Sequence, residues 1–263
     1  MSVEFISSLL ILGLLVGVLA GLLGIGGGLA VVPALHYLLP TIGVSDQVGM
    51  HIALATSLSC IIVTTSSSVF NNIRLKNIDF SVARSLVPGV VLGGLLGANI
   101  ANWIPTEYLP KVFGVIVLGM AWQMFRSVSA VTSKPMPRSL ITTLYGTGIG
   151  TVASLAGVGG GSLSVPFMNR HGIEMKKSVG TSSICAFSIA VAGMIGFTLH
   201  GFHSDDLPKW SLGYVYLPAL LSISITSIFT TKIGVRLAVG LPTKTLKKIF
   251  AVFLMIVAGT MLL

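Results

Sequence analysis

The chain has 263 residues, of which 53% are hydrophobic and only 9% are charged. This composition excludes a soluble globular protein and is typical of an integral membrane protein with about eight to ten membrane segments. The net charge of +9 does not indicate binding to nucleic acid, because the basic residues lie in predicted loops and form no patch between aromatic residues. We therefore expect a lipid bilayer, and no nucleic acid, around this chain.

The first apolar stretch, residues 3–39, is too long for one membrane span and slightly short for two. A run of glycines interrupts it. The break leaves an arm of about 20 residues before it and about 12 after it, or roughly 30 Å and 18 Å of helix. We predict a helical hairpin whose tip lies deep in the membrane. The stretch is not expected to be a cleaved signal, because its N-terminus has no basic region.

The remaining segments follow in an order that occurs twice. Three spans complete the first half, a linker with Ser, Lys and Pro follows, and a second glycine-broken stretch opens the second half. The sequence thus predicts an all-α, polytopic membrane protein with two repeats in one membrane domain. The predicted parts are a first repeat at 1–126 with spans at 50–71, 80–103 and 107–126, a cytoplasmic linker at 127–137, and a second repeat at 138–263 with a hairpin at 139–169 and spans at about 177–200, 211–233 and 244–263.

Two glycine runs relate the halves. The run from Gly21 to Pro33 recurs from Ser154 to Pro166 at one offset, 133, with no gap. A glycine-rich break present once per half is typical of transporters built from repeats. In these proteins broken helices meet near the bilayer midplane, and their free backbone groups hold the substrate. The alternative is that the glycines only allow helices to pack closely.

Shorter matches extend the repeat. Ala55–Ser57 matches Gly180–Ser182 at offset 125, and Ile104–Thr106 matches Leu241–Thr243 at offset 137. The offset changes only in predicted loops, where insertions are tolerated. The two halves therefore correspond over most of their length.

The basic residues predict the orientation in the membrane. If each broken stretch enters and leaves the membrane on the same side, the four basic loops all lie on one side of the membrane. In that arrangement 14 of the 16 Lys and Arg residues are cytoplasmic. Only Lys111 and Lys209 then lie on the other side. The same count of crossings inverts the second repeat relative to the first and places both termini outside the cytoplasm.

All seven acidic residues lie in predicted loops or at span ends. Their absence from the bilayer centre argues against a cation transporter and against a carboxylate proton relay. No His or Cys has the spacing of a metal site, and no hydrolase or nucleotide-binding motif is present. We therefore expect no catalytic residue, no metal and no cofactor, and an integral membrane enzyme is disfavoured.

The N-terminal ends of the two short hairpin arms are predicted to bind an anion. Each short arm begins at a glycine triplet, so its first N–H groups lack helical partners and its dipole is positive there. Hydroxyls on the following spans are suitable donors. Alternatively, the hydroxyls bond helix backbone and the two thiols are core residues. The candidate substrate-binding residues are Gly26, Gly27, Gly28, Thr56, Ser57, Cys60, Gly159, Gly160, Gly161, Ser162, Thr181, Ser182 and Cys185.

The paired Gly-x-Gly-Gly-Gly…Pro runs, the Ala-Thr-Ser and Gly-Thr-Ser that follow them, and the basic loop before the last span resemble the TauE/SafE family of sulfite exporters over nearly the whole chain. The resemblance implies a carrier in the bacterial inner membrane for sulfite, sulfonates such as sulfoacetate, or related small anions, usually outward. One departure is that the second arm begins Gly161-Ser-Leu-Ser where the first begins Gly28-Leu-Ala-Val. This difference makes the second arm the more polar.

Three other functions stay open from the residues themselves. These are an uptake permease for sulfate-like or thiosulfate-like anions, an anion channel, and a non-transporting membrane scaffold. The sequence does not predict the coupling ion or the oligomeric state.

Overall fold

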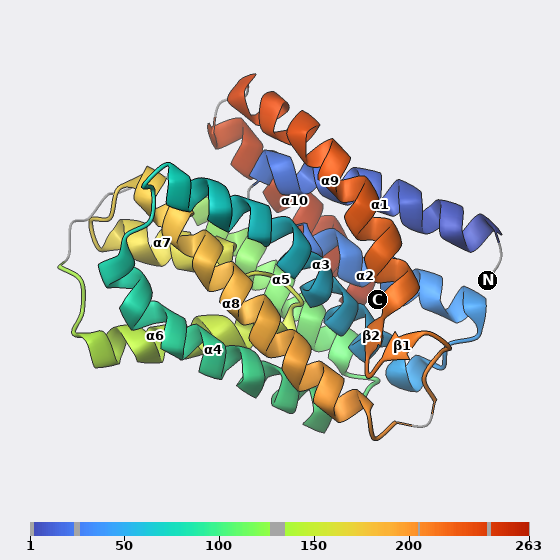
Figure 1. Ribbon diagram of the computed structural model, residues 1–263. Coiled ribbons are helices and arrows are strands. Elements are labelled where there is room, and N and C mark those ends of the chain that lie inside the picture. The colour runs from blue at the N-terminus through green and yellow to red at the C-terminus, as the bar shows by residue number, and fades with distance from the viewer. Residues whose placement is uncertain (1–2, 24–26, 127–134, 205, 241–242, 263) are drawn as a thin grey trace.

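The computed structural model describes residues 3–23, 27–126, 135–204, 206–240 and 243–262. Over these residues the protein is almost entirely helical, which confirms the predicted all-α class, and the helices form one bundle (Figure 1). A 3-10 turn, Leu39–Ile42, follows α2, and two short strands, β1 (Ser211–Leu212) and β2 (Val215–Tyr216), precede α9. The helices are α1 (Val3–Leu23), α2 (Gly28–Leu38), α3 (Asp46–Arg74), α4 (Phe80–Trp103), α5 (Leu109–Arg126), α6 (Ser139–Leu155), α7 (Gly161–Arg170), α8 (Met175–Gly201), α9 (Leu217–Gly240) and α10 (Thr243–Leu262).

Within the described part of the chain, five helices are long and apolar enough to cross a membrane, namely α1, α3, α4, α8 and α9. The predicted span at 80–103 has the same bounds as α4, and the other predicted spans agree with helices to within a few residues, with one exception described below. Most of the predicted linker at 127–137 lies outside the described residues.

Both glycine-broken stretches form helical hairpins, as predicted. The arms of the first have 21 and 11 residues, and those of the second have 17 and 10. Each short arm follows a glycine in the left-handed region, Gly27 or Gly160, both with φ of 68°. Only glycine adopts this conformation without strain. With 11 and 10 residues, the short arms are about 15 to 17 Å long, which is half of a hydrocarbon core of about 30 Å.

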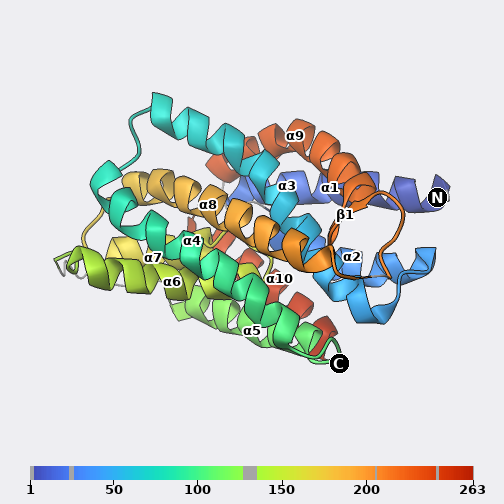
Figure 2. The ribbon, with the colours of Figure 1, turned by 60° about the horizontal axis from the view of Figure 1, so that its bottom comes forward.

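The two halves exchange helices with each other. α1 of the first half packs along α9 of the second, and α6 of the second half packs along α4 of the first. In both pairs glycines allow the backbones to approach closely: Gly13 and Gly17 face Thr226 and Thr230, and Gly89, Gly93 and Gly97 face Thr143, Thr147 and Thr151. The residue numbers rise together along each interface, so the paired helices are parallel. Figures 1 and 2 show that α1 and α6 themselves start at opposite ends of the bundle.

The exception among the predicted spans concerns residues 211–216. The predicted span at 211–233 is wrong over these residues, which pair as β1 and β2, and α9 begins only at Leu217. Trp210 and Gly213 have positive φ angles of 69° and 53°, so this short segment turns twice and cannot continue a helix. Tyr214 and Tyr216 are buried, which explains why the segment is as apolar as a span.

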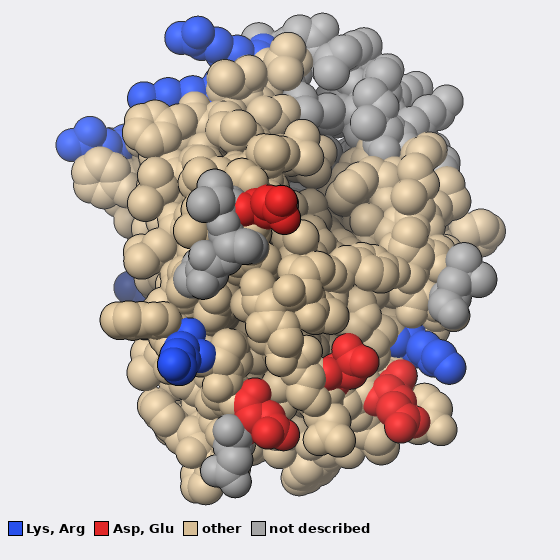
Figure 3. Space-filling view, turned by 90° about the vertical axis from the view of Figure 1, so that its right-hand side faces the viewer, with Lys and Arg blue, Asp and Glu red and all other residues tan. Residues whose placement is uncertain are grey.

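The bundle has two distinct ends. We call the end where α3 and α9 finish and α4, α6 and α8 begin the basic end, and the end that carries β1 and β2 the strand end (Figure 2). The described basic residues near the basic end are Arg74, Lys76, Arg84, Arg138, Arg170, Lys176, Lys177, Lys232 and Arg236. The strand end, which faces the viewer in Figure 3, is a mostly uncharged surface with scattered acidic and basic side chains.

Candidate functional site

The tips of the two helical hairpins meet in the middle of the bundle. The hydroxyl of Ser57, on α3, donates to the carbonyl oxygen of Gly157 at 2.7 Å and to that of Gly28 at 3.2 Å. One side chain thus joins the first residue of α2 to the loop between α6 and α7. Ser57 is fully buried, so the contact lies deep in the protein.

The two tips differ in the space around them. A Cβ atom added to Gly28 would lie 2.5 Å from the carbonyl oxygen of Gly157 and 2.6 Å from Ile61, so the first tip is sealed by packing. A Cβ atom added to Gly161, the equivalent residue, would meet no described residue outside its own helix turn closer than the hydroxyl of Ser182, at 3.9 Å. Of these two equivalent glycines in the described part of the chain, Gly161 therefore has open space beside it and Gly28 does not.

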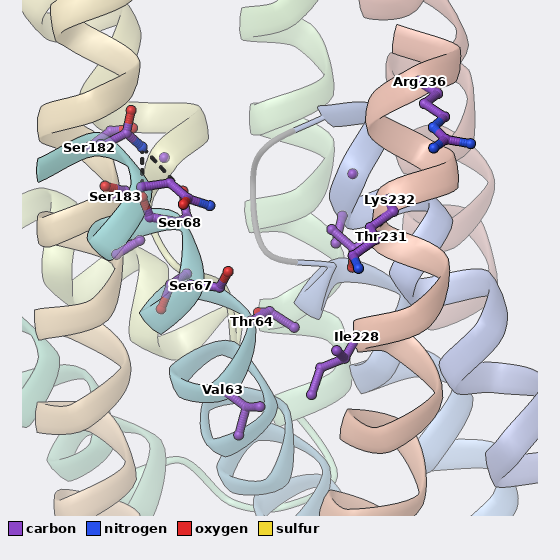
Figure 4. A pocket seen from close by; sticks show the side chains of 17 residues that line it. Val63, Thr64, Ser67, Ser68, Ser182, Ser183, Ile228, Thr231, Lys232 and Arg236 are labelled. Carbon is purple, nitrogen blue, oxygen red and sulfur yellow. Dashed lines mark hydrogen bonds between the residues drawn. The ribbon is translucent and has the colours of Figure 1, made fainter. Parts of the chain in front are cut away.

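That open space is a cavity of about 560 Å³ between α3, α8 and α9, which also reaches Ala20 and Gly21 at the end of α1. Gly161 and the hydroxyl-bearing Ser182 and Ser183 form its inner part, and Lys232 and Arg236 of α9 line it toward the basic end. Figure 4 shows Thr64 and Ser67 of α3 facing α9 across this space. Both basic side chains are exposed, so the cavity reaches the surface beside them, near the basic end.

Small polar side chains of α3 form one wall of the cavity. They recur every three to four residues, which places them on one face of the helix: Thr64, Thr65, Ser67, Ser68, Asn71 and Asn72. Several of them bond their own helix, as when Thr65 donates to Ile61 and Asn72 donates to Ser68. Hydroxyl donors of this kind can rotate from a helix carbonyl to a bound ligand.

The electrostatic character of the cavity is positive. Its described lining includes Lys232 and Arg236 but neither Asp nor Glu. The N-terminus of α7 also begins there, at Gly161, and carries partial positive charge on its free N–H groups. Next along α7, the hydroxyl of Ser162 is buried and has no hydrogen-bond partner among the described residues. The described charges around the cavity are therefore all positive.

Two candidate hydroxyls have equivalent structural partners. Thr56 accepts a hydrogen bond from the amide of Tyr216 at 3.0 Å, and Thr181 accepts one from the amide of Asp79 at 2.9 Å. Each donor directly precedes a helix, α9 or α4. Both threonines are fully buried and neither lines the cavity. They fix the start of a helix from the other half of the chain.

The carboxylate of Asp79 caps α4 in addition. It accepts from the hydroxyl of Ser81 and from the amides of Ser81 and Val82. These bonds, the Ser81 hydroxyl first, lower the pKa of the Asp79 carboxyl below its ordinary value, because they favour the charged form.

The other candidates are spread around the two tips. Gly27 packs against the long arm of its own hairpin, Gly160 packs against Ile189 of α8 and against α6, and Gly159 packs against Ala186. Cys60 and Cys185 are buried free thiols away from the cavity lining, and Gly26 lies outside the described residues. Of the predicted set, Gly161 and Ser182 line the cavity.

Sequence reasoning missed the polar face of α3 and the part that Lys232 and Arg236 play in the cavity. A signal for α3 was present, because a run of Thr, Ser and Asn at helical spacing is unusual within a membrane span. The charge pattern assigns the two basic residues only to orientation, and no local pattern shows that they line one cavity with Gly161.

Comparison with known proteins decides the family. The profile of the family described as sulfite exporter TauE/SafE matches residues 9–261. The chain belongs to the TauE/SafE family. It is 40% identical to a probable membrane transporter protein of Haemophilus influenzae over 98% of both chains. It is 27% identical to one of Methanocaldococcus jannaschii, over 97% of this chain and 94% of the other.

No solved structure matches the chain. The family model and the relatives describe membrane transporters, and five described helices are apolar enough to cross a membrane. This TauE/SafE protein is therefore a multi-pass membrane transporter of the cell membrane and not an enzyme. Membership implies a small-molecule substrate and a lipid environment.

Proposed function

We propose that this TauE/SafE protein carries a small sulfur oxyanion or a short organosulfonate, such as sulfite or a sulfoacetate-like compound, out of the cytoplasm. The observation that carries the proposal is the cavity of about 560 Å³ that ends at Gly161 and Ser182 and has Lys232 and Arg236 toward its mouth. The family description, sulfite exporter, supports the same class of substrate.

The chemistry of the cavity fits an anion that must also be released. Free N–H groups at a helix N-terminus and small hydroxyls bind oxyanion oxygens without a salt bridge. The two basic side chains lie at the exposed part of the cavity, where they raise the local concentration of anions and are screened by water. Affinity at the inner part is thus moderate, as a carrier requires.

A carrier is favoured over an anion channel because the cavity opens at one end. Toward the strand end, α3 is packed by buried residues of α8 and of the strand segment: the His51 ring stacks on Tyr214 at 5.1 Å, and Phe197 is fully buried beside it. The excess of basic residues predicts that the open end faces the cytoplasm, from which an exporter takes its substrate. The inverted repeats and the cytoplasmic linker are part of this proposal.

A binding and exchange experiment tests the function. The purified protein is screened by thermal unfolding against sulfite, sulfate, thiosulfate and sulfoacetate, since a ligand of the folded state raises apparent stability. Proteoliposomes preloaded with the stabilising anion are then assayed for counterflow of the labelled anion, which a channel does not show. An uptake permease differs from an exporter in the direction of net flux in intact cells. Absence of both stabilisation and counterflow with all four anions would contradict the proposal.

A further inference from the structure

The internal repeat relates the two helices that form the cavity walls, α3 and α9, to a second pair of helices, α8 and α4. Offset 125 carries α3 onto α8, as Thr56 corresponds to Thr181, and offset 137 carries α9 onto α4, as Tyr216 corresponds to Asp79. The structure shows the same bond in both places, from Tyr216 to Thr56 and from Asp79 to Thr181. The contact between α8 and α4 is therefore the counterpart of the contact between α3 and α9.

The two equivalent interfaces, α3 with α9 and α4 with α8, differ in how closely their helices pack. α3 and α9 diverge toward the basic end, where Ser67 and Thr231 both line the cavity between them. Their equivalents, Ala192 on α8 and Gly94 on α4, touch: a Cβ atom added to Gly94 would lie 3.0 Å from that of Ala192. One interface is open and the other is closed, although the sequence relates them.

We infer that the substrate leaves through a second route, now closed, between α4 and α8, which opens at the strand end when the cavity between α3 and α9 closes. This inference rests on the proposed transport function. The moving parts are the two tightly packed pairs, α4 with α6 and α9 with α1. α3 and α8 pack against each other in the centre and serve as the fixed partner of both.

The residues of the closed route make it less attractive to anions than the entrance. The positions that correspond to Lys232 and Arg236 are Leu95 and Asn99, and the side-chain oxygen of Asn99 lies 3.0 Å from Nε2 of His200. An anion that enters past two positive charges thus leaves past an apolar residue and a neutral amide. The inner end of the route corresponds to Gly28 and Ser57, which the contact with Gly157 now seals.

A disulfide across the closed interface tests the inference. The variant is Gly94→Cys/Ala192→Cys in a parent with Cys60→Ala and Cys185→Ala, reconstituted in proteoliposomes and assayed by counterflow of labelled sulfite. The two Cβ atoms are close enough to be bridged with a small shift. Oxidation should lower counterflow by about tenfold or more, because one of the two states is lost, while stabilisation by sulfite persists because the cavity stays open. Reduction should restore counterflow.

The matched control is a disulfide within one moving pair. Gly97→Cys/Ser154→Cys bridges α4 to α6, where a Cβ atom added to Gly97 lies 2.7 Å from that of Ser154. Its counterflow should be the same before and after oxidation. Counterflow through oxidised Gly94→Cys/Ala192→Cys at the rate of the reduced protein would overturn the inference.

A readout without transport separates this inference from the proposed function. A disulfide formed in Ser67→Cys/Thr231→Cys closes the present cavity and should open the other interface. Hydrogen exchange measured by mass spectrometry should then quicken in residues 91–99 of α4 and 189–197 of α8. If sulfite neither binds nor exchanges in the parent, the proposed substrate is wrong and this measurement still decides the route. Unchanged exchange in both segments of the bridged protein would refute it.

Discussion

The hydroxyl of Ser57 and the carbonyl oxygen of Gly157 form a 2.7 Å hydrogen bond between α3 of the first half and the hairpin tip of the second half. By the internal offsets, the serine equivalent to Ser57 is Ser182, and it donates to Val179 of its own helix instead, at 2.8 Å. One serine thus closes a tip, and the other is available at the wall of the cavity.

Ser57→Ala should destabilise the protein by about 1–3 kcal/mol, because it leaves the buried carbonyl oxygen of Gly157 without its hydroxyl donor. Ser182→Ala should leave unfolding nearly unchanged, since it removes only a local bond, and should weaken anion binding by about tenfold. Thermal unfolding without and with sulfite measures both effects. Equal loss of stability in the two variants would contradict the assigned difference.

Gly28→Val and Gly161→Val should have opposite phenotypes. The first inserts a side chain 2.5 Å from a backbone carbonyl, so folded protein should be lost or Tm strongly lowered. The second places the side chain in the cavity, where the nearest described side chain, that of Ser182, lies 3.9 Å from the added Cβ atom. It should express and unfold as the parent does but lose stabilisation by the anion. Wild-type affinity in Gly161→Val would place the ligand elsewhere.

Thr56→Val and Thr181→Val should behave alike. Each leaves a backbone amide, that of Tyr216 or Asp79, without its hydroxyl acceptor, which should cost about 1–3 kcal/mol of stability. The sulfite affinity of protein that folds should stay within about twofold of the parent, as neither hydroxyl lines the cavity and a twofold change is under about 0.5 kcal/mol. Denaturant unfolding and ligand titration of the same samples measure the two quantities, with Thr→Ser variants as controls that keep the acceptor.

Lys232→Gln/Arg236→Gln should slow sulfite transport at low ionic strength and have little effect at high salt. Their charges attract the anion over a Debye length, which is about 10 Å at 0.1 M salt and about 3 Å at 1 M. Lys209→Gln, which removes a positive charge near the strand end, is the matched control. Initial rates between about 10 mM and 1 M salt would reveal the difference. A loss of rate that salt does not change would mean direct coordination of the substrate by these residues.

Asp79→Ala should lower stability by about 0.5–2 kcal/mol through loss of the cap on α4, and Asp79→Asn should retain most of it. Because the folded-state pKa of this carboxyl is lowered, its stabilisation is present above its unfolded pKa and is lost as the pH falls from that value through the folded pKa. The stability difference between the parent and the Asp79→Asn variant should therefore shrink when the pH is lowered below about 4. A difference that grows on acidification would contradict the capping role.

The sequence predicted the hairpins and the span at 80–103 because glycine runs and apolar lengths are local properties. The greater polarity of the second arm, through Ser162, stays a prediction. The sequence did not predict the strand segment at 211–216, since an apolar composition does not distinguish a membrane span from a buried turn. Nor could it predict which tip is open, because internal repeats relate Gly28 and Gly161 as equivalents, whereas the conformation makes one packed and the other free.

The exchange of helices between the halves, with α1 on α9 and α6 on α4, has a consequence for biosynthesis. When the ribosome has finished the first half, the glycine faces of α1 and α4 have no partner, because both partners are encoded downstream. The face of α4 gains its partner when α6 has been made, and the face of α1 only when α9 has been made. The packing of the first helix is therefore completed only after nearly the whole chain has been synthesised.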